Sequence, residues 1–366
     1  MSNAGKTAQR RPKKVSPRTL APSLILRPTP RQAGGGRYRH ALVQKSYAMI
    51  AEGSKSFAAA SRLFDPVTRE RVWMLYAWCR RCDDIADGQE MGGELGNQSN
   101  IADRVKSIRI LTRRALAGEP TADVAFDAFG QVASEVGLTM QHADDVIAGF
   151  ELDAQDWRPR SEDDLARYCY HVAGAVGVMM AKVMGVQDDD EYTLDRACDL
   201  GLAFQLANIA RDLDEDDRAG RCYLPMEWLA EEDIEPGQLM KPHHQWERAD
   251  LASRLVLRMD RHAKAARLGT VRLPFRSRWA ILAAANIYSE IGLEVRRRGP
   301  KAWDHRVVIP AWEKLRLITS AFFEAIRNNP LPPDEMPVWT RDAILLEVRM
   351  RGPIAEATME PLPDGE

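Results

Sequence analysis

Carboxylates crowd the end of one apolar segment, Gly201 to Pro225, whose sequence is GLAFQLANIARDLDEDDRAGRCYLP. Five of them fall within six residues, at Asp212, Asp214, Glu215, Asp216 and Asp217. Acids in the last turn of a helix oppose the helix dipole, and like charges four residues apart repel each other. A divalent cation would relieve both effects, so this helix end is a candidate metal site.

Polar residues also mark one face of the same helix. They recur at spacings of three and four, which places them on one side of an otherwise apolar rod. These positions are Gln205, Asn208, Asp212 and Asp216. We expect Asp212 and Asp216 to face the site, with Glu215 as a further candidate. The other two acids, Asp214 and Asp217, are expected to lie in solvent.

A second acidic helix end lies in MLYAWCRRCDDIAD, residues 74–87. Asp83 and Asp87 are four residues apart and share a face, and Gly88 ends the helix. One acidic helix end is usually a solvated surface, but two on separate apolar helices favour a shared role. Mg²⁺ prefers oxygen ligands, commonly one or two carboxylates with water and substrate phosphate oxygens. The two clusters therefore predict a clamp that holds a diphosphate through several Mg²⁺ ions.

Basic residues lie close to both clusters. Arg80 and Arg81 precede the first cluster, and Arg211 and Arg218 flank the second. Lys55 lies in the segment GSKSFAAASRLF. We expect Arg80 and Arg211 to contact phosphate. The alternative for each of these side chains is a local ion pair with a neighbouring acid.

Apolar residues recur at helical spacing through almost the whole chain after Tyr38. Helices are predicted over 41–60, 66–87, 101–117, 121–136, 139–155, 162–185, 189–217, 245–268, 275–298 and 309–328, and near 338–350. The sequence has no convincing run of alternating strands and no internal repeat. We therefore expect a single all-α domain with helices around a central cavity.

Charge is distributed unevenly along the chain. Residues 1–40 hold ten Lys and Arg and no Asp or Glu, so the other residues carry a net charge of −12. We expect a disordered basic tail over 1–37, the helical domain over 38–330, and a C-terminal extension with a short helix over 331–366. The basic tail is either inert or acts as a transit peptide, a lipid-surface anchor or a nucleic-acid arm. The acidic body argues against nucleic acid as a partner.

Cysteine usage and hydropathy bear on the compartment. Five cysteines without a secretory segment ahead of them indicate a reducing, cytoplasmic setting. Cys79 and Cys82 form one C-x-x-C with no second pair at zinc spacing, so no zinc or redox role is expected there. No apolar run reaches the ~18 to 20 residues that a membrane span needs.

Four motifs together resemble the squalene/phytoene synthase family of head-to-head prenyl synthases, and they are most similar to its bacterial carotenoid type, the phytoene synthases. They are GSKSFAAASRLF at 53–64, MLYAWCRRCDDIAD at 74–87, YCYHVAGAVGVMMA at 168–181 and LGLAFQLANIARDLDEDDRAGRCYLP at 200–225. The resemblance covers roughly residues 45–300. It implies an all-α isoprenoid synthase fold.

The resemblance also implies a reaction. Two geranylgeranyl diphosphates condense head to head to prephytoene diphosphate, which rearranges to phytoene, and diphosphate is released. The reaction uses Mg²⁺ or Mn²⁺, roughly two or three ions, and a nicotinamide cofactor is not expected. The alternative within the family is a squalene or dehydrosqualene synthase that uses farnesyl diphosphate.

Individual residues take roles from the same resemblance. Catalytic roles fall on Asp83, Asp87, Tyr168, Asp212 and Asp216. The metal ligands implied are these four aspartates and Asn208. The substrate-binding residues that the resemblance implies are Ser56, Phe57, Arg80, Gln205, Asn208 and Tyr288. The charge beside the two clusters adds Lys55, Arg211 and Arg218 as expected substrate-binding residues. For Tyr168 the alternative is a core tyrosine with a satisfied hydroxyl.

The segment Val172 to Val186 mixes small Gly and Ala with three Met. Beside the two acidic clusters we interpret it as a wall for two long polyprenyl chains, with a tightly packed core helix as the alternative. A lipophilic substrate and product predict peripheral contact with the inner face of the membrane. They also allow contact with downstream carotenoid enzymes.

Overall fold

The computed structural model describes residues 32–53, 60–88, 101–154 and 157–351. This described part is helical and contains no β-strand. Its helices are α2 (Arg39–Gly53), α4 (Pro66–Asp87), α5 (Ile101–Leu116), α6 (Val124–Val136), α7 (Met140–Ala154), α8 (Glu162–Cys169), α9 (Ala175–Val183), α10 (Glu191–Arg218), α11 (Met226–Glu231), α12 (Gln245–Gly269), α13 (Phe275–Arg298), α14 (Ala311–Arg327) and α15 (Arg341–Arg351). The predicted all-α class is confirmed, and only the short α11 has no counterpart among the predicted helices.

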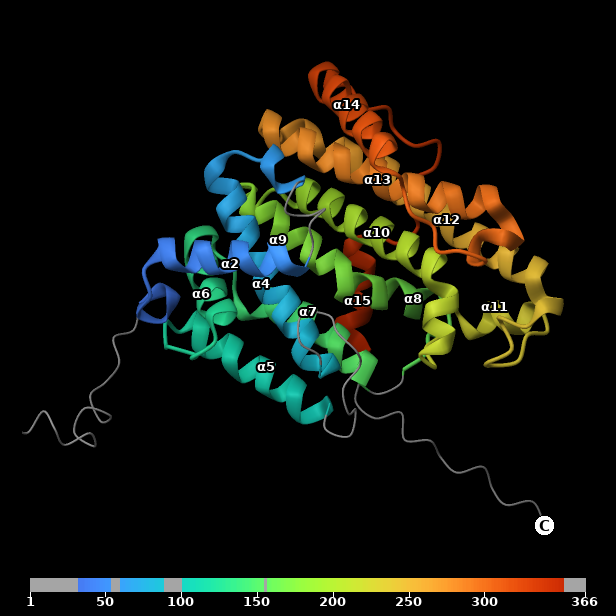
Figure 1. Ribbon diagram of the computed structural model, residues 1–366, viewed down its shortest axis with the longest axis horizontal. Helices are drawn as coiled ribbons and strands as arrows, with labels where there is room; N and C mark the ends of the chain where they lie inside the picture. The colour runs from blue at the N-terminus through green and yellow to red at the C-terminus, as the bar shows by residue number, and fades with distance from the viewer. Residues whose placement is uncertain (1–31, 54–59, 89–100, 155–156, 352–366) are drawn as a thin grey trace, which may run out of the picture.

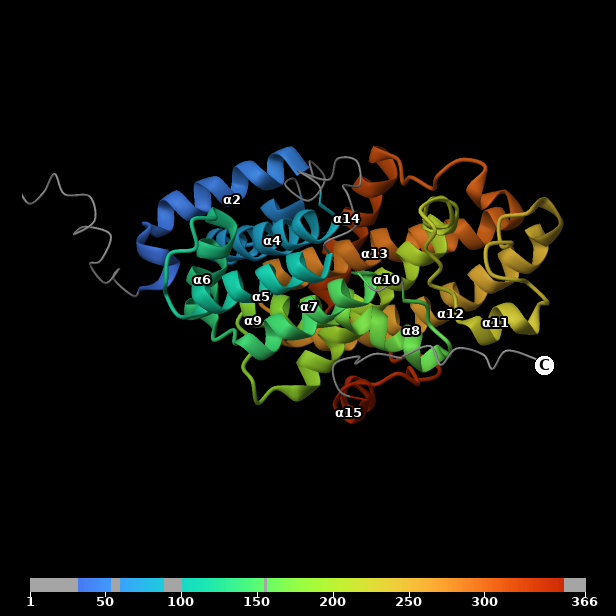
Figure 2. The same cartoon turned by 90° about the horizontal axis from the view of Figure 1, so that it is seen from below.

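The long helix α10 runs through the middle of the molecule (Figures 1 and 2). It packs against α9 and α8 and, on another side, against α12 and α13. Helices α2 and α4 to α7 form the other part of the bundle, and α9 contacts α4, α6 and α7 as well as α10. Residues at the end of α10 therefore lie where both parts of the bundle meet.

The ends of α4 are set by local sequence. The Asp65 carboxylate accepts hydrogen bonds from the backbone N–H groups of Val67 and Thr68, both at 3.1 Å, and Pro66 occupies the first helical position. At the other end Gly88 adopts a left-handed φ of 65° and its N–H donates to the last carbonyls. This stop leaves the first acidic cluster in the last turn of α4.

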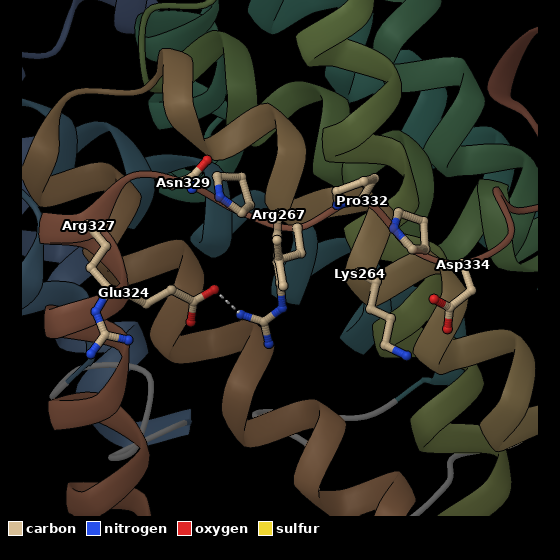
Figure 3. Close-up of a pocket in the computed structure, with 10 residues that line it drawn as sticks. Lys264, Arg267, Glu324, Arg327, Asn329, Pro332 and Asp334 are labelled. Carbon is tan, nitrogen blue, oxygen red and sulfur yellow. Dashed lines mark hydrogen bonds and ion pairs between the residues drawn. The ribbon is translucent and has the colours of Figure 1, made fainter.

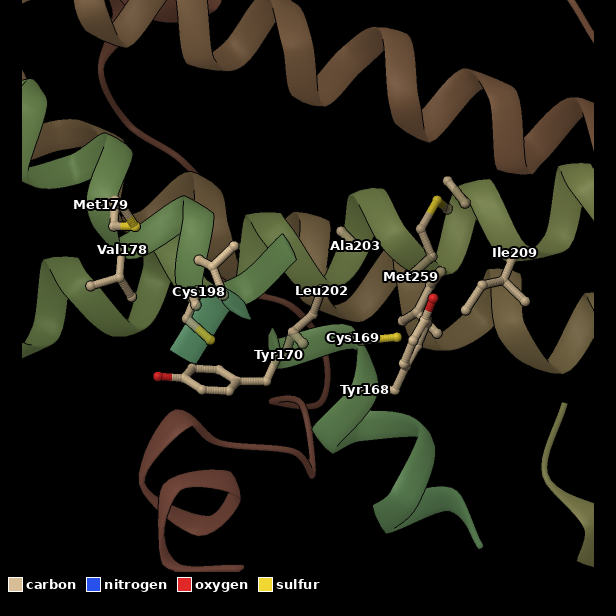
Figure 4. Close-up of a cluster of buried hydrophobic side chains, with 14 of the residues drawn as sticks. Tyr168, Cys169, Tyr170, Val178, Met179, Cys198, Leu202, Ala203, Ile209 and Met259 are labelled. Carbon is tan, nitrogen blue, oxygen red and sulfur yellow. The ribbon is translucent and has the colours of Figure 1, made fainter. Parts of the chain in front are cut away.

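The helix predicted over 162–185 is interrupted by a π-helical turn, η5 (Tyr170–Gly174), between α8 and α9. A π turn adds one residue to a helical turn and shifts the face that later side chains present. Tyr168 and Tyr170 point to different parts of the core, as residues two apart on a helix do (Figure 4). The hydroxyl of Tyr170 donates to Asp145 at 2.8 Å, whereas Tyr168 lies near the candidate site.

Glycines bring the π turn, α9 and α10 into close contact. A Cβ at Gly177 would lie 2.3 Å from the carbonyl oxygen of Ala197, and one at Gly201 would lie 2.2 Å from that of Ala173. Backbone atoms cannot move aside as a flexible side chain can. The close contact at Gly177 supports a tightly packed core helix, rather than the room for prenyl chains that we expected along Val172 to Val186.

The basic tail is expected to be disordered up to residue 37, but residues 32–37 lie against the helical body. Arg37 pairs with the buried carboxylate of Asp127 at 2.8 Å. A Cβ at Gly35 would lie 2.6 Å from the same carboxylate, and Gly35 has a φ of 60°, which glycine adopts without strain. The tail boundary at 37 is therefore wrong, because the glycines form a packed turn.

The segment after residue 330 joins the main core. Trp339 and Ile344 are buried in the main hydrophobic cluster. Arg341 at the start of α15 pairs with Asp195 of α10 at 2.9 Å, and Figure 2 shows α15 beneath α8. Among the described residues, no helix is both long and apolar enough to cross a membrane.

Candidate active site

One face of the central helix α10 remains open to solvent. Its polar positions are only half-buried, and they are Gln205, Asn208, Asp212 and Asp216. The residues between them, by contrast, are buried, among them Leu206, Ala207, Ile209 and Ala210. Within the described residues, the side chains of Gln205 and Asn208 have no hydrogen-bond partner. A polar, accessible face on a central helix is a place where water or a ligand can bind.

Two guanidinium groups hold the carboxylate of Asp212. Arg211 donates to it from Nε at 2.7 Å, and Arg306 pairs with it at 2.8 Å. Arg306 also lies 3.7 Å from Glu215. In the structure Arg211 therefore makes the local ion pair that was given as the alternative to phosphate contact. The same two arginines stand where a diphosphate at this helix end would need positive charge.

Asp216 experiences an environment rich in negative charge. Burial, together with the nearby carboxylates of Asp212, Glu215 and Asp153, raises its pKa to about 7, and Arg221 acts in the opposite direction. Crowded carboxylate oxygens are the donor set that a hard divalent cation prefers. The residues at this end of α10 thus fit a Mg²⁺ or Mn²⁺ ion.

The fit is partial in one respect. Within the described residues, which omit the Asp87 side chain, no group of three or more His, Cys, Asp or Glu could hold a metal ion. An ion at this site would complete its shell with water and substrate oxygens, as Mg²⁺ commonly does.

The far side of the same helix end carries a separate ion-pair group. Asp214 is 19% exposed and pairs with Arg218 at 2.5 Å, while the buried Arg248 also senses the charges of Asp214 and Asp217. Helix rotation places these residues opposite Asp212. Asp214 is therefore paired rather than free in solvent as expected, and Asp217 is half-buried. Arg218 makes the local ion pair that was given as its alternative, its side chain is 74% exposed, and its phosphate contact stays a prediction.

The first acidic cluster is organised by Arg80. Its guanidinium pairs with Asp83 and with Asp84, both at 2.9 Å, and Asp84 is buried whereas Asp83 is half-exposed. Arg81 turns away and pairs with Asp123, the residue that caps α6, at 2.7 Å. Arg80 thus has local ion-pair partners here, and Asp83 is the carboxylate that remains accessible.

Several expected site residues lie outside the description. Lys55, Ser56 and Phe57 are not among the described residues, and of Asp87 only its place at the end of α4 is described. Asp83 pairs with Arg80 of its own helix, and the meeting of the two aspartate motifs across one site stays a prediction.

Tyr168 lies in a buried group of aromatic rings. Its ring stacks on that of Tyr223 with centroids 4.6 Å apart, and Trp157 flanks it at 5.8 Å. Both tyrosine hydroxyls donate to Asp153 of α7, at 3.1 Å and 3.0 Å. Burial raises the pKa of Tyr168 well above its usual value. The structure therefore provides the satisfied hydroxyl of the alternative, and a catalytic role for Tyr168 stays a prediction.

Two residues of this site, Asp153 and Arg306, are absent from the sequence-based set. Asp153 lies in the last turn of α7, so it shows the same acid-at-helix-end pattern that marked the other clusters. Arg306 lies in the link before α14 and has no such pattern around it. Only the fold brings Arg306 to Asp212.

Tyr288 of α13 reaches the accessible face of α10. Its ring stacks on Phe204 with centroids 4.0 Å apart. Burial raises the pKa of its hydroxyl, and the nearby Arg211 opposes that rise. Tyr288, Phe204 and Arg211 therefore lie beside the polar stripe, and the role of Tyr288 in lining the site stays a prediction.

An open cavity of about 430 Å³ lies elsewhere, between α12, α14 and the proline-rich link that follows α14 (Figure 3). Lys264 and Arg267 line it from the C-terminal part of α12. His262 in that part bonds to Asp199 of α10 at 2.8 Å, so the cavity lies on the order of 20 Å along α10 from Asp212. It is not part of the candidate active site.

Comparison with known proteins agrees with this geometry. A family model described as Squalene/phytoene synthase matches residues 50–313, and the chain belongs to the squalene/phytoene synthase family. A 15-cis-phytoene synthase of Pantoea ananas is 43% identical over 304 residues, covering 82% of this chain and 98% of that protein. Another 15-cis-phytoene synthase, from Enterobacter agglomerans, is 44% identical over 293 residues, with 79% and 98% covered.

Solved structures show the same fold at lower identity. A dehydrosqualene synthase in complex with a ligand superimposes with a TM-score of 0.70 at 24% identity, covering 80% of this chain and 98% of that one. The squalene synthase HpnC from Alicyclobacillus acidocaldarius gives a TM-score of 0.64 at 22% identity, covering 73% and 98%. The expected isoprenoid synthase fold is confirmed.

Proposed function

We propose that this protein is a phytoene synthase, which joins two geranylgeranyl diphosphates head to head through prephytoene diphosphate to phytoene and releases diphosphate. The observation that carries the proposal is the accessible, acidic face of the central helix α10 in a chain 43% identical to a 15-cis-phytoene synthase over 304 residues. The squalene and dehydrosqualene synthases named above are similar at 24% identity or less, which supports the fold alone. Phytoene synthesis is thus better supported than squalene synthesis.

The proposed metal ligands are Asp83, Asp87, Asn208, Asp212 and Asp216. Mg²⁺ or Mn²⁺, when bound, would withdraw charge from the diphosphate oxygens and make diphosphate a better leaving group. The crowding that raises the pKa of Asp216 to about 7 supports a cation at this end of α10. The Asp83 cluster would bind the diphosphate from the opposite side of the site.

Arginines of the chain would complete the diphosphate site. Arg211 and Arg306 neutralise Asp212 in the structure, and both are charged at any physiological pH. A cation held by Asp212 would leave the guanidinium groups of Arg211 and Arg306 available to diphosphate oxygens. Their role is to bind and orient the leaving group, and Arg80 would do the same from α4.

Apolar side chains of the site would exclude water. Allylic and cyclopropyl carbocations react with water, so each ionisation needs a dry environment. The stacked rings of Phe204 and Tyr288 stand beside the polar stripe, and α9, which packs against α10, carries the half-buried Val176 and Met180. These residues would hold the polyprenyl chains while the polar end of α10 holds the diphosphates.

Product analysis tests the proposal directly. Purified full-length protein is incubated with Mg²⁺ and either geranylgeranyl or farnesyl diphosphate, without a nicotinamide, and the hydrocarbons are identified. We expect phytoene from the C20 substrate and loss of the product when the metal is chelated. A C30 hydrocarbon from farnesyl diphosphate, with nothing from the C20 substrate, would assign the dehydrosqualene reaction instead.

We place this activity in the cytoplasm at the inner face of the membrane, where a lipophilic substrate and product reside. Enzymes that consume phytoene would be its neighbours there. Separation of a cell lysate into cytosol and membranes, followed by detection of the protein in each, tests this location.

A further inference from the structure

The outer face of α14 is apolar and exposed. Trp312, Leu315, Phe323 and Ile326 are 68%, 66%, 55% and 57% exposed. With Thr319 they recur at spacings of three and four, so they form one stripe along the whole helix. Single exposed apolar residues are normal, but a continuous stripe indicates a surface that binds something.

The opposite face of α14 already holds the helix to the protein. Ala321 and Ala325 are fully buried, where they form a small core with Leu282 and Ala283 of α13. Figure 1 shows α14 at the outer edge of the molecule, against α13. The exposed stripe therefore contributes nothing to this packing.

Exposed charges on α14 are positive. Its exposed positions include Arg316 and Arg327 and no acid. The two acids of the helix are less exposed and are paired, Glu313 with Arg316 and Glu324 with Arg267. The chain beyond residue 40 carries a net charge of −12, so this face departs from the character of the whole protein.

The stripe also leads toward the candidate active site. Arg306 pairs with Asp212, the exposed Val308 follows it, and Trp312 begins the stripe four residues later. A surface bound to α14 would therefore lie close to the link that carries Arg306.

We propose that α14 is an interfacial helix that docks this protein on a bilayer containing anionic lipids. The four large apolar side chains enter the boundary between headgroups and acyl chains, with Arg327 at the anionic headgroups. A second copy of the chain on the same stripe is the competing occupant, and the experiment below separates it from the bilayer. The inference deepens the proposed function and rests on it for the source of the substrate, whereas lipid binding itself is measured independently of activity.

Flotation of the full-length protein with vesicles tests the proposal. We expect it to float with phosphatidylcholine vesicles that contain phosphatidylglycerol. A Leu315→Ser/Phe323→Ser variant should lose on the order of tenfold or more of its bound fraction, because the change removes two apolar side chains that the bilayer would bury. Arg327→Gln should lose roughly fivefold with the anionic vesicles and show no loss with phosphatidylcholine alone.

A matched control removes exposed apolar residues from another helix. Trp246→Ser/Leu257→Ser changes two exposed side chains of α12 and should float as the wild type does. Thermal unfolding confirms that each variant is folded, and both double variants should convert detergent-dispersed substrate at the wild-type rate. The wild type and its variants can bind vesicles as expected and yet form no phytoene. In that case the proposed function fails and the lipid-binding surface stands.

Three outcomes would overturn the proposal. The first is a wild type that does not float with either vesicle. The second is a Leu315→Ser/Phe323→Ser variant that floats as the wild type does. If deletion of residues 1–31 from the wild type also abolishes flotation, the N-terminal tail binds the vesicle instead of α14. The third is a wild-type dimer by light scattering that the same variant converts to a monomer, with no vesicle binding by either, which would assign the stripe to a second copy of the chain.

Discussion

Single residues at the end of α10 differ in role according to the face they occupy. Asp212 and Asp216 lie on the accessible side, where arginines and other carboxylates surround them. Asp214 lies two residues away on the other side, paired with Arg218. Chemically identical side chains within one motif thus have different environments, because consecutive residues of a helix project about 100° apart.

Asparagine substitutions test this division. Asp212→Asn should lower the rate of phytoene formation on the order of a thousandfold, since a neutral amide is a poor ligand for a cation that stabilises the leaving group. Asp214→Asn, the matched control from the opposite face, should stay within roughly tenfold of the wild type. Steady-state rates at saturating Mg²⁺ measure both. Equal losses in the two variants would contradict the assignment of faces.

Protonation of a buried histidine should make stability depend on pH. Burial lowers the pKa of His171 to about 4, and the ring bonds through Nδ1 to the backbone carbonyl of Asp145 at 2.8 Å. The unfolded chain binds this proton near pH 6.5 and the folded chain does not, so stability is lost as the pH falls from about 6.5 toward 4. The contribution to the free energy of unfolding between pH 7.5 and 5 is about 2 kcal/mol.

The measurement is urea unfolding of the wild type and of His171→Gln at both pH values. Glutamine keeps a hydrogen-bond donor and cannot become charged. We expect the wild type to lose about 2 kcal/mol more than the variant on acidification. Equal losses would show that His171 is protonated in the folded protein at pH 5.

At the scale of elements, close helix contact governs the region between α9 and α10. Gly201 of α10 meets the backbone of Ala173 in the π turn, and Gly177 meets the backbone of Ala197. Such contacts fix how α10 is rotated relative to its neighbours. The rotation in turn decides that Gln205 and Asn208 point to the accessible side.

Gly201→Ala should therefore destabilise the protein by about 1–3 kcal/mol, because the added methyl meets a carbonyl oxygen that cannot move. Gly292→Ala in α13 is the matched control. Its nearest neighbour is the flexible side chain of Met259, and alanine favours a helix by about 1 kcal/mol over glycine. Urea unfolding should show a loss only for Gly201→Ala. An unchanged midpoint for that variant would mean that α10 and the π turn can separate without cost.

At the scale of the whole molecule, the C-terminal segment is part of the core. Trp339 and Ile344 are buried in the main cluster, and Arg341 pairs with Asp195 of the central helix. The bundle is thus stabilised by segments from both ends of the described chain, residues 32–37 and α15. The predicted domain of residues 38–330 would lack both.

Truncation tests how much the C-terminal segment contributes. Deleting residues 335–366 should lower the free energy of unfolding by roughly 4 kcal/mol, the sum for two large buried apolar side chains. Deleting only 352–366 takes away no residue that the structure describes and should leave the unfolding midpoint unchanged. Thermal and urea unfolding of both forms give the comparison. If the longer deletion also leaves the midpoint unchanged, α15 is not a structural part of the bundle.

Much of the fold could be predicted because helical signals are local. The periodicity of α4, α10 and α13 follows from residues three and four apart. The limits of α4 are marked just as locally, by Asp65-Pro66 and Gly88. The π turn, the packed glycine turn at residues 33–36 and α11 depend on contacts with distant segments. No local pattern could indicate them.

By itself the sequence determined the two acidic helix ends, the polar stripe of α10 and the all-α class, since each depends on residue type and spacing along one helix. Tertiary structure decided which groups meet across the fold. It brought Arg306 to Asp212 and Asp153 to the two tyrosines. These partners lie on different segments of the chain, so only the packing of the helices selects them.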